Sequence, residues 1–189
     1  QYTPNALSDW EANIQGRQPQ NTDAWTGADE NLALYDDLFQ GNDLGLPHLM
    51  PATIQKSIEQ LSKRGYKYYQ ARAGDGYAVN GLNLYVLARL LWNPSLDVNA
   101  IVQDYADHGF GQAAPEAEQY FNRLGSQWEM QTDERVGTGS ATLSEYERVA
   151  AAYPPSFLTA CREDLWKIYH YYRLTKGESQ RRVQFLEDG

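Results

Sequence analysis

Residues 31–92 alternate between short apolar runs and helical patterns, and this order restricts the fold more than any other feature of the sequence. The apolar stretch at 31–41 closes with acids and a glycine, which is typical of a buried strand that runs into a loop. A helix is predicted from Pro51 to Arg64, and YKYYQA (66–71) is predicted to be a second strand. Strand–helix–strand order implies parallel strands joined by a right-handed crossover.

Only helices are predicted after the second strand. The first runs from Leu82 to Trp92, and Asn80 can cap it; its apolar residues go almost all round, as in a helix buried on most sides. Pro94 ends this helix, and Asp97 can cap the next one. Apart from a linker at 131–144, helical spacing continues over 97–109, 117–128, 142–152, 155–174 and 178–187.

Two strands do not form a stable sheet of their own. The sequence therefore predicts either a piece of a larger protein or further strands hidden in the N-terminal region. Residues 1–30 are otherwise interpreted as irregular, because they are polar and only Trp10 and Trp25 are large apolar anchors.

The overall composition narrows the class of protein. The chain has 189 residues, 42% of them hydrophobic, which suits one globular domain or a little more. A net charge of −9 would repel phosphate backbones, so nucleic-acid binding is not expected. No apolar run is long enough to span a membrane, and residues 1–30 lack the basic and then apolar order of a signal peptide.

The cysteine and histidine residues predict no metal site and no cofactor. Cys161 is the one cysteine, which excludes an intrachain disulfide, and its helical spacing from apolar neighbours predicts an inert buried thiol. His48, His108 and His170 lie far apart, without the spacing of metal ligands.

The glycine-rich stretch ARAGDGYAVNG (71–81) does not match the phosphate-binding motifs. It lacks the lysine and hydroxyl of a Walker loop and the third glycine of a dinucleotide fingerprint. What remains is a set of planar hydrogen-bonding groups, which suits sugar hydroxyls or an anionic ring substituent: Arg72, Asp75, Tyr77 and Asn80. In the alternative interpretation, Arg72 pairs with Asp75, and Asn80 only caps its helix.

A resemblance to a known family is carried by LALYDDLFQG (32–41), by the long stretch 44–111 and by APEAEQYFNRL (114–124). Its most specific part is NGLNLYVLARLLWNPSLD (80–97), and the tail RRVQFLEDG (181–189) is also similar. From residue 32 to about 128 the chain resembles a domain-of-unknown-function family of bacterial glycoside-hydrolase-like proteins akin to alpha-glucuronidases. The resemblance implies an α/β fold, helix-dominated overall, in which the closing strand-helix units of a (β/α)8 barrel precede an α-helical region. The expected divisions are an irregular segment at 1–30, the C-terminal part of the barrel at 31–131 and the helical region at 132–189.

In such barrels the active site lies at the carboxyl ends of the strands, so Asp36 and Asp37 become catalytic candidates. Glycoside hydrolysis uses two carboxyl groups, and strand alternation allows only one of this pair to face the lumen. The pair can equally well end a strand in water. Arg72 stands where family members often place a glutamate, which favours holding a carboxylate or sulfate over acid–base chemistry.

The resulting hypothesis is a carbohydrate-active protein that acts on or binds an acidic polysaccharide. A non-catalytic carbohydrate-binding or scaffold module is the first alternative, and a helical protein-interaction module is the second. The expected partners are carbohydrate and either the remainder of the barrel or a self-associating copy, and a secreted or periplasmic location fits the resemblance. Trp166, Tyr169 and Tyr172 are predicted to form a packing face, which would invite self-association if it were uncovered.

Overall fold

The chain is mostly helical in the part that the structure describes. The computed structural model describes residues 33–37, 49–72, 77–138, 153–171, 174 and 176–188. The elements in chain order are β1 (Ala33–Asp37), α2 (Pro51–Lys63), β2 (Tyr68–Arg72), α3 (Tyr77–Trp92), α4 (Val98–Phe110), the 3-10 helix η1 (Gly111–Ala113), α5 (Ala114–Thr138), α7 (Pro155–His170) and α8 (Glu178–Asp188). None of the described helices is long and apolar enough to cross a bilayer.

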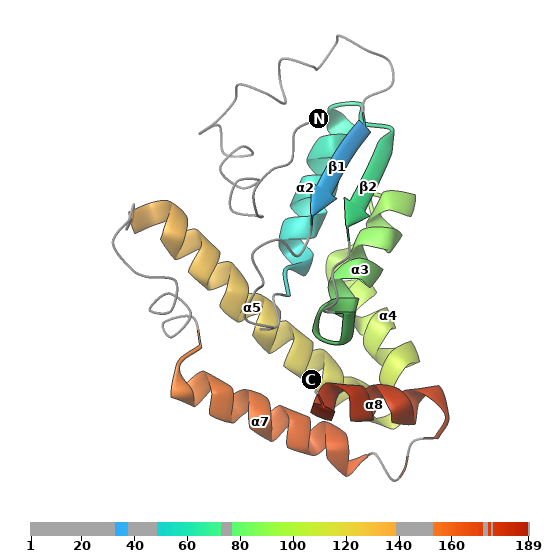
Figure 1. Cartoon of the computed structure of the whole chain (residues 1–189), viewed down its shortest axis with the longest axis vertical. Coiled ribbons are helices and arrows are strands. Elements are labelled where there is room, and N and C mark those ends of the chain that lie inside the picture. The colour runs from blue at the N-terminus through green and yellow to red at the C-terminus, as the bar shows by residue number, and fades with distance from the viewer. Residues whose placement is uncertain are drawn as a thin grey trace.

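The two strands pair in parallel, as the order of elements predicted. The register aligns Ala33 with Tyr68 at one end and Asp37 with Arg72 at the other. Helices α2 and α3 run back along one face of this sheet, against the direction of the strands (Figure 1). Leu34 is buried in the core between the sheet and the helices.

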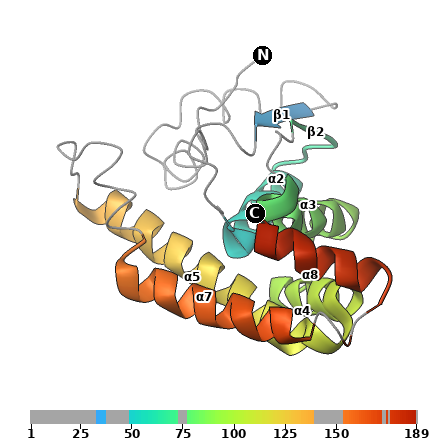
Figure 2. The same ribbon diagram turned by 60° about the horizontal axis from the view of Figure 1, so that its bottom comes forward.

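The prediction of a closing (β/α)8 barrel is wrong for the described part of the chain. The described strands form one two-stranded sheet. Among the described residues after α3 no strand joins this sheet; α4, α5, α7 and α8 instead pack on one another beyond α2 and α3 (Figure 2). The predicted alternation of strand and helix is confirmed for two units, β1–α2 and β2–α3, but the helices that follow do not surround a barrel.

Helix α2 begins and ends where local signals placed it. Pro51 occupies the first turn, where its missing N–H costs nothing, and Ile54, Ile58 and Leu61 are buried on one face. Gly65 follows the C-cap with φ of 82°, a left-handed conformation that glycine adopts without strain. The predicted helix and its stop are confirmed.

Helix α3 begins earlier than predicted and is less enclosed. It starts at Tyr77, so Asn80 lies inside the first turn and does not cap the helix as predicted. Leu82, Val86 and Leu90 are buried in the core. The last two residues of α3 are instead exposed: 43% of Leu91 and 92% of Trp92 are open to solvent.

Helix α4 confirms the predicted cap, because the Asp97 carboxylate accepts hydrogen bonds from the backbone N–H groups of Asn99 and Ala100. Its core face joins α5 through an aromatic cluster. The ring of Phe121 on α5 lies 5.6 Å from that of Tyr105 and 5.5 Å from that of Phe110, both on α4. These edge-on contacts fasten α4 to α5.

Of the C-terminal helices, α7 packs on α5, and α8 packs on α4 and α7. Helix α5 continues to Thr138, so the linker predicted from residue 131 is helical in its first part, and the helix predicted at 142–152 lies outside the described residues. Helix α8 confirms its prediction, and Val183 is buried. On α7, Trp166 and Tyr169 are exposed, so these two side chains do not form the packing face that was predicted, and Tyr172 lies outside the described residues.

Candidate functional site

The predicted catalytic residues lie at one edge of the sheet. The carboxyl ends of β1 and β2 and the first turns of α2 and α3 lie at the same end of the strand–helix unit (Figure 1). The register pairs Asp36 with Ala71 and Asp37 with Arg72, so the predicted acid and the predicted arginine occupy neighbouring backbone positions. Paired strands lie about 5 Å apart.

The remaining predicted binding residues follow this edge along the chain. Tyr77 opens α3, whereas Asp75 lies outside the described residues. Asn80 is completely buried in the first turn of α3, so its amide lies inside the protein. The structure therefore gathers Asp36, Asp37, Arg72 and the start of α3 at one end of the sheet, and Asn80 lies beneath the surface there.

A second buried amide holds this end of the molecule together. The Asn83 side-chain oxygen accepts a hydrogen bond from the backbone N–H of Met50 at 3.0 Å, and both residues are buried. Met50 immediately precedes α2, and its carbonyl accepts the N–H of Ile54 at 3.0 Å. The amide of Asn83 thus joins the beginning of α2 to α3, behind the sheet edge.

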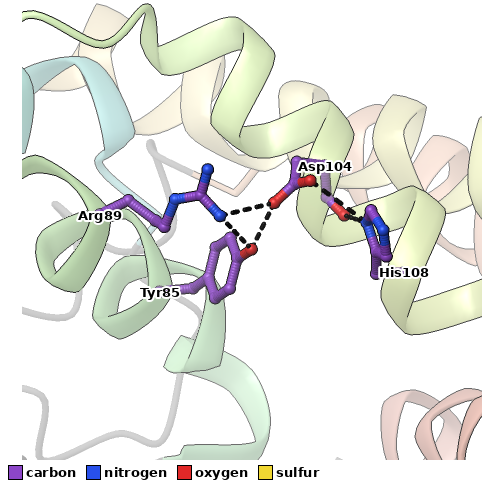
Figure 3. Close-up of polar contacts among 4 residues, drawn as sticks. All are labelled: Tyr85, Arg89, Asp104 and His108. Carbon is purple, nitrogen blue, oxygen red and sulfur yellow. Dashed lines mark hydrogen bonds and ion pairs between the residues drawn. The ribbon is translucent and has the colours of Figure 1, made fainter.

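A polar cluster lies between α3 and α4, and sequence reasoning did not single it out. Figure 3 shows its four members, which we term the α3–α4 cluster: Tyr85, Arg89, Asp104 and His108. The Tyr85 hydroxyl donates to Asp104 Oδ2, and Arg89 Nη1 donates to the same carboxylate oxygen at 3.2 Å and to the Tyr85 oxygen at 3.1 Å. His108 Nδ1 lies 3.2 Å from Asp104 Oδ1 and 3.0 Å from its backbone oxygen.

The electrostatics of the α3–α4 cluster keep the Tyr85 hydroxyl protonated. Its hydrogen bond to Asp104 raises the pKa of Tyr85, burial adds to the effect, and the nearby Arg89 opposes it. Tyr85 and Arg89 are four residues apart on α3, as are Asp104 and His108 on α4, so each pair shares a helix face. This spacing was visible in the sequence, but it did not say that α3 and α4 would bring the pairs together.

A second set of charged side chains forms an ion pair between α5 and α7. Arg123 Nε lies 2.6 Å from Asp164 Oδ2, and Lys167 Nζ lies 3.7 Å from the other carboxylate oxygen. Asp164 is only 1% exposed, so the carboxylate depends on these cations for its charge compensation. The hydrogen bond to Asp164 raises the pKa of the Arg123 guanidinium above its usual value.

Cys161 lies one turn from this ion pair on α7 and is buried, as predicted. Burial raises the pKa of its thiol to about 11, and burial likewise raises the pKa of Tyr120 to about 12. The thiolate is the reactive form of cysteine. An inert thiol is therefore what this environment produces, and Cys161 is no candidate nucleophile.

The thiol should react slowly until the protein unfolds. At pH 9 about half of an ordinary cysteine with a pKa near 9.0 is ionised, against about 1% of a thiol with a pKa of about 11. We expect iodoacetamide to alkylate the native protein at least about 50-fold more slowly than the urea-unfolded chain at pH 9. Equal rates would contradict the burial of Cys161.

The same shift predicts a loss of stability in alkali. Burial raises the pKa of the Cys161 thiol in the folded protein above its value in the unfolded chain. The contribution of the protonated thiol to the free energy of unfolding is therefore fully present below pH 9 and is lost as the pH rises through about 11. A Cys161→Ala variant should lose less of its urea midpoint between pH 8.5 and 10.5 than the unmodified protein does.

The described side chains include no group of three metal-ligand residues, and His48 lies outside the described residues.

A protein-family model, described as a domain of unknown function (DUF4838), matches residues 7–122, which is more than half the chain. No curated protein and no solved structure matches the sequence. The matched range contains the sheet edge and the α3–α4 cluster, and it ends within α5.

Proposed function

The chain belongs to the DUF4838 family, and we propose that it is a carbohydrate-active, glycoside-hydrolase-like protein that holds an acidic polysaccharide at the carboxyl edge of β1 and β2. The observation that carries the proposal is the register of the sheet. Asp37 and Arg72 are direct partners across the two strands, at the end where ligands of parallel sheets bind.

The two residue types suit an acidic sugar in different ways. The planar guanidinium of arginine matches a carboxylate or sulfate with two parallel hydrogen bonds. A carboxyl group such as that of Asp36 or Asp37 can serve as one of the two that glycoside hydrolysis requires.

The first alternative, a non-catalytic carbohydrate-binding or scaffold module, has the same support at the sheet edge. It differs in a single outcome, since it binds the sugar without cleaving it. The second alternative, a helical protein-interaction module, is favoured by the exposed apolar side chains along α7: Leu158, Trp166 and Tyr169.

Binding of uronic-acid oligosaccharides and of their methyl esters tests the proposal, because esterification removes the charge and keeps the sugar. Losing a charged hydrogen bond costs about 1.5–3 kcal/mol. Arg72→Ala should therefore weaken binding of the acidic forms about tenfold or more and leave the esters nearly unchanged, as measured by isothermal titration calorimetry. Arg162→Ala, at an exposed arginine of α7, is the matched control and should change neither.

Turnover separates the enzyme from the binding module. One of the two variants Asp36→Asn and Asp37→Asn should abolish product formation from any oligosaccharide that the protein cleaves, whereas Asp107→Asn, at an exposed aspartate of α4, should not. Unchanged turnover in both variants would remove the pair from catalysis. Binding without turnover favours the module. If Arg72→Ala weakens acidic and neutral forms equally, the arginine does not recognise the acid, and absence of any saccharide binding contradicts the proposal as a whole.

A further inference from the structure

The most exposed large hydrophobic side chain among the described residues is that of Trp92, at the end of α3. Its exposure is 92%, although indole rings are usually largely buried in folded proteins. An indole ring offers a flat apolar face, which gains free energy when another flat apolar surface covers it.

Trp92 extends the row of side chains that forms the α3–α4 cluster. Tyr85, Arg89 and Trp92 lie at positions i, i+4 and i+7 of α3, which follow one stripe of a helix surface. The hydrogen bonds of Asp104 to Tyr85 and Arg89 place α4 directly beside this stripe (Figure 3). Seven helical residues rise by about 10 Å, so the stripe is long enough for a short oligosaccharide.

The chemistry of the stripe suits an uncharged ligand that is rich in hydroxyl groups. Arg89 Nη1 lies 3.2 Å from Asp104 Oδ2, so the two opposite charges offset each other locally. Both groups are planar and partly exposed, and 81% of the His108 side chain is exposed beside them. Donors and acceptors in a row next to a bare aromatic ring match the polar rim and the apolar face of a sugar ring.

A protein partner fits this surface less well. Among the described side chains of α3 and α4, Leu91 and Trp92 are the large apolar ones that are exposed. Stable protein interfaces bury about 800 Å² on each partner, and an aromatic side chain supplies about 150–250 Å². The core of an interface is also depleted in charge, whereas Arg89 and Asp104 lie within this stripe.

We propose that Trp92 and the α3–α4 cluster form a second saccharide-binding surface, which takes an uncharged stretch of a polysaccharide with a sugar ring stacked on the indole of Trp92. This inference rests on the proposed function and adds a subsite to it. Trp92 lies at the opposite end of α3 from the sheet edge, because α3 begins at Tyr77. A rise of 1.5 Å per residue separates the two ends by about 22 Å, so the sites are distinct.

The test is calorimetric binding of neutral hexasaccharides, namely cellohexaose, xylohexaose and mannohexaose, with the galacturonate hexamer as a probe of the sheet edge. Trp92→Ala should weaken binding of the preferred neutral probe at least about tenfold, and Trp92→Phe, which keeps a ring, should retain most of it. Trp166→Ala is the matched control, because Trp166 is also exposed on a helix but lies on α7. Since 92% of Trp92 is exposed, its replacement should leave the unfolding temperature unchanged.

Each result decides between the proposals. If the protein binds saccharides and Trp92→Ala binds neutral probes as tightly as the unmodified protein, the second surface is excluded while the proposed function stands. Equal weakening by Trp166→Ala also overturns it, as does a wild-type protein that binds only the galacturonate probe. If Trp92→Ala instead dissociates a dimer in sedimentation experiments, the surface is a protein interface. If no saccharide binds at all, both the proposed function and the second surface are excluded.

Discussion

Leu90→Ala is expected to lower the free energy of unfolding by about 3 kcal/mol, within the range of about 2–5 kcal/mol for a buried leucine truncated to alanine. Leu90 is completely buried in α3. Truncation removes apolar contacts and leaves a cavity that the packed helices α2 and α4 can close only in part. Urea unfolding followed by circular dichroism measures the change.

The adjacent residue provides the control. Leu91 has the same side chain on the same helix but is 43% exposed, so Leu91→Ala should cost under about 1 kcal/mol. The two variants make the same chemical change, and only burial distinguishes them. Similar losses for both variants would contradict the burial of Leu90 and the exposure of Leu91 on α3.

Arg123→Ala is expected to destabilise the protein by about 3 kcal/mol, because it leaves the buried Asp164 carboxylate with only Lys167 at 3.7 Å. The contact joins α5 to α7, so the C-terminal helices should lose their protection first. Urea unfolding gives the free energy, and amide hydrogen exchange of α7 shows where the loss begins.

An exposed ion pair of similar chemistry is the matched control. Arg181 Nη1 lies 3.7 Å from Glu178 on α8, and both side chains are mostly exposed. Arg181→Ala should cost less than about 1 kcal/mol, since solvent screens such pairs. If Arg123→Ala costs no more than Arg181→Ala, the buried pair does not hold α7 in place. A double variant, Arg123→Met with Asp164→Leu, should recover much of the loss, because it removes the buried charge as well.

Local signals in the sequence predicted the elements that depend on local chemistry. Pro51, Gly65 and Asp97 each act within one helical turn, through a fixed φ, a left-handed conformation and a capping hydrogen bond, and they placed the boundaries of α2 and α4 correctly. The parallel pairing of β1 and β2 followed from the helix between them.

The errors concern features that depend on distant residues. Asn80 resembled a cap because asparagine favours that position, but α3 extends to Tyr77 and buries the side chain instead. The polar residues after 131 resembled a linker, although α5 continues through them to Thr138. The barrel was inferred from resemblance, and spacing along the chain could not show that the later helices would pack on one another.

The candidate site was predictable in the same uneven way. The sheet edge followed from the ends of two strands, so Asp36, Asp37 and Arg72 could be named from sequence, and their role stays a prediction. The α3–α4 cluster could not be assembled, because its two halves are separated by 15 residues from Arg89 to Asp104 and meet only through helix packing.

The hydrogen bond from Met50 to Asn83 limits how this protein can diversify. Asn83 recognises the main chain at position 50 and not the side chain, so any residue that fits the space and has an N–H preserves the contact. Proline alone lacks that N–H among the standard residues. In related sequences, position 83 should therefore tolerate little change. Position 50 should vary among apolar residues other than proline.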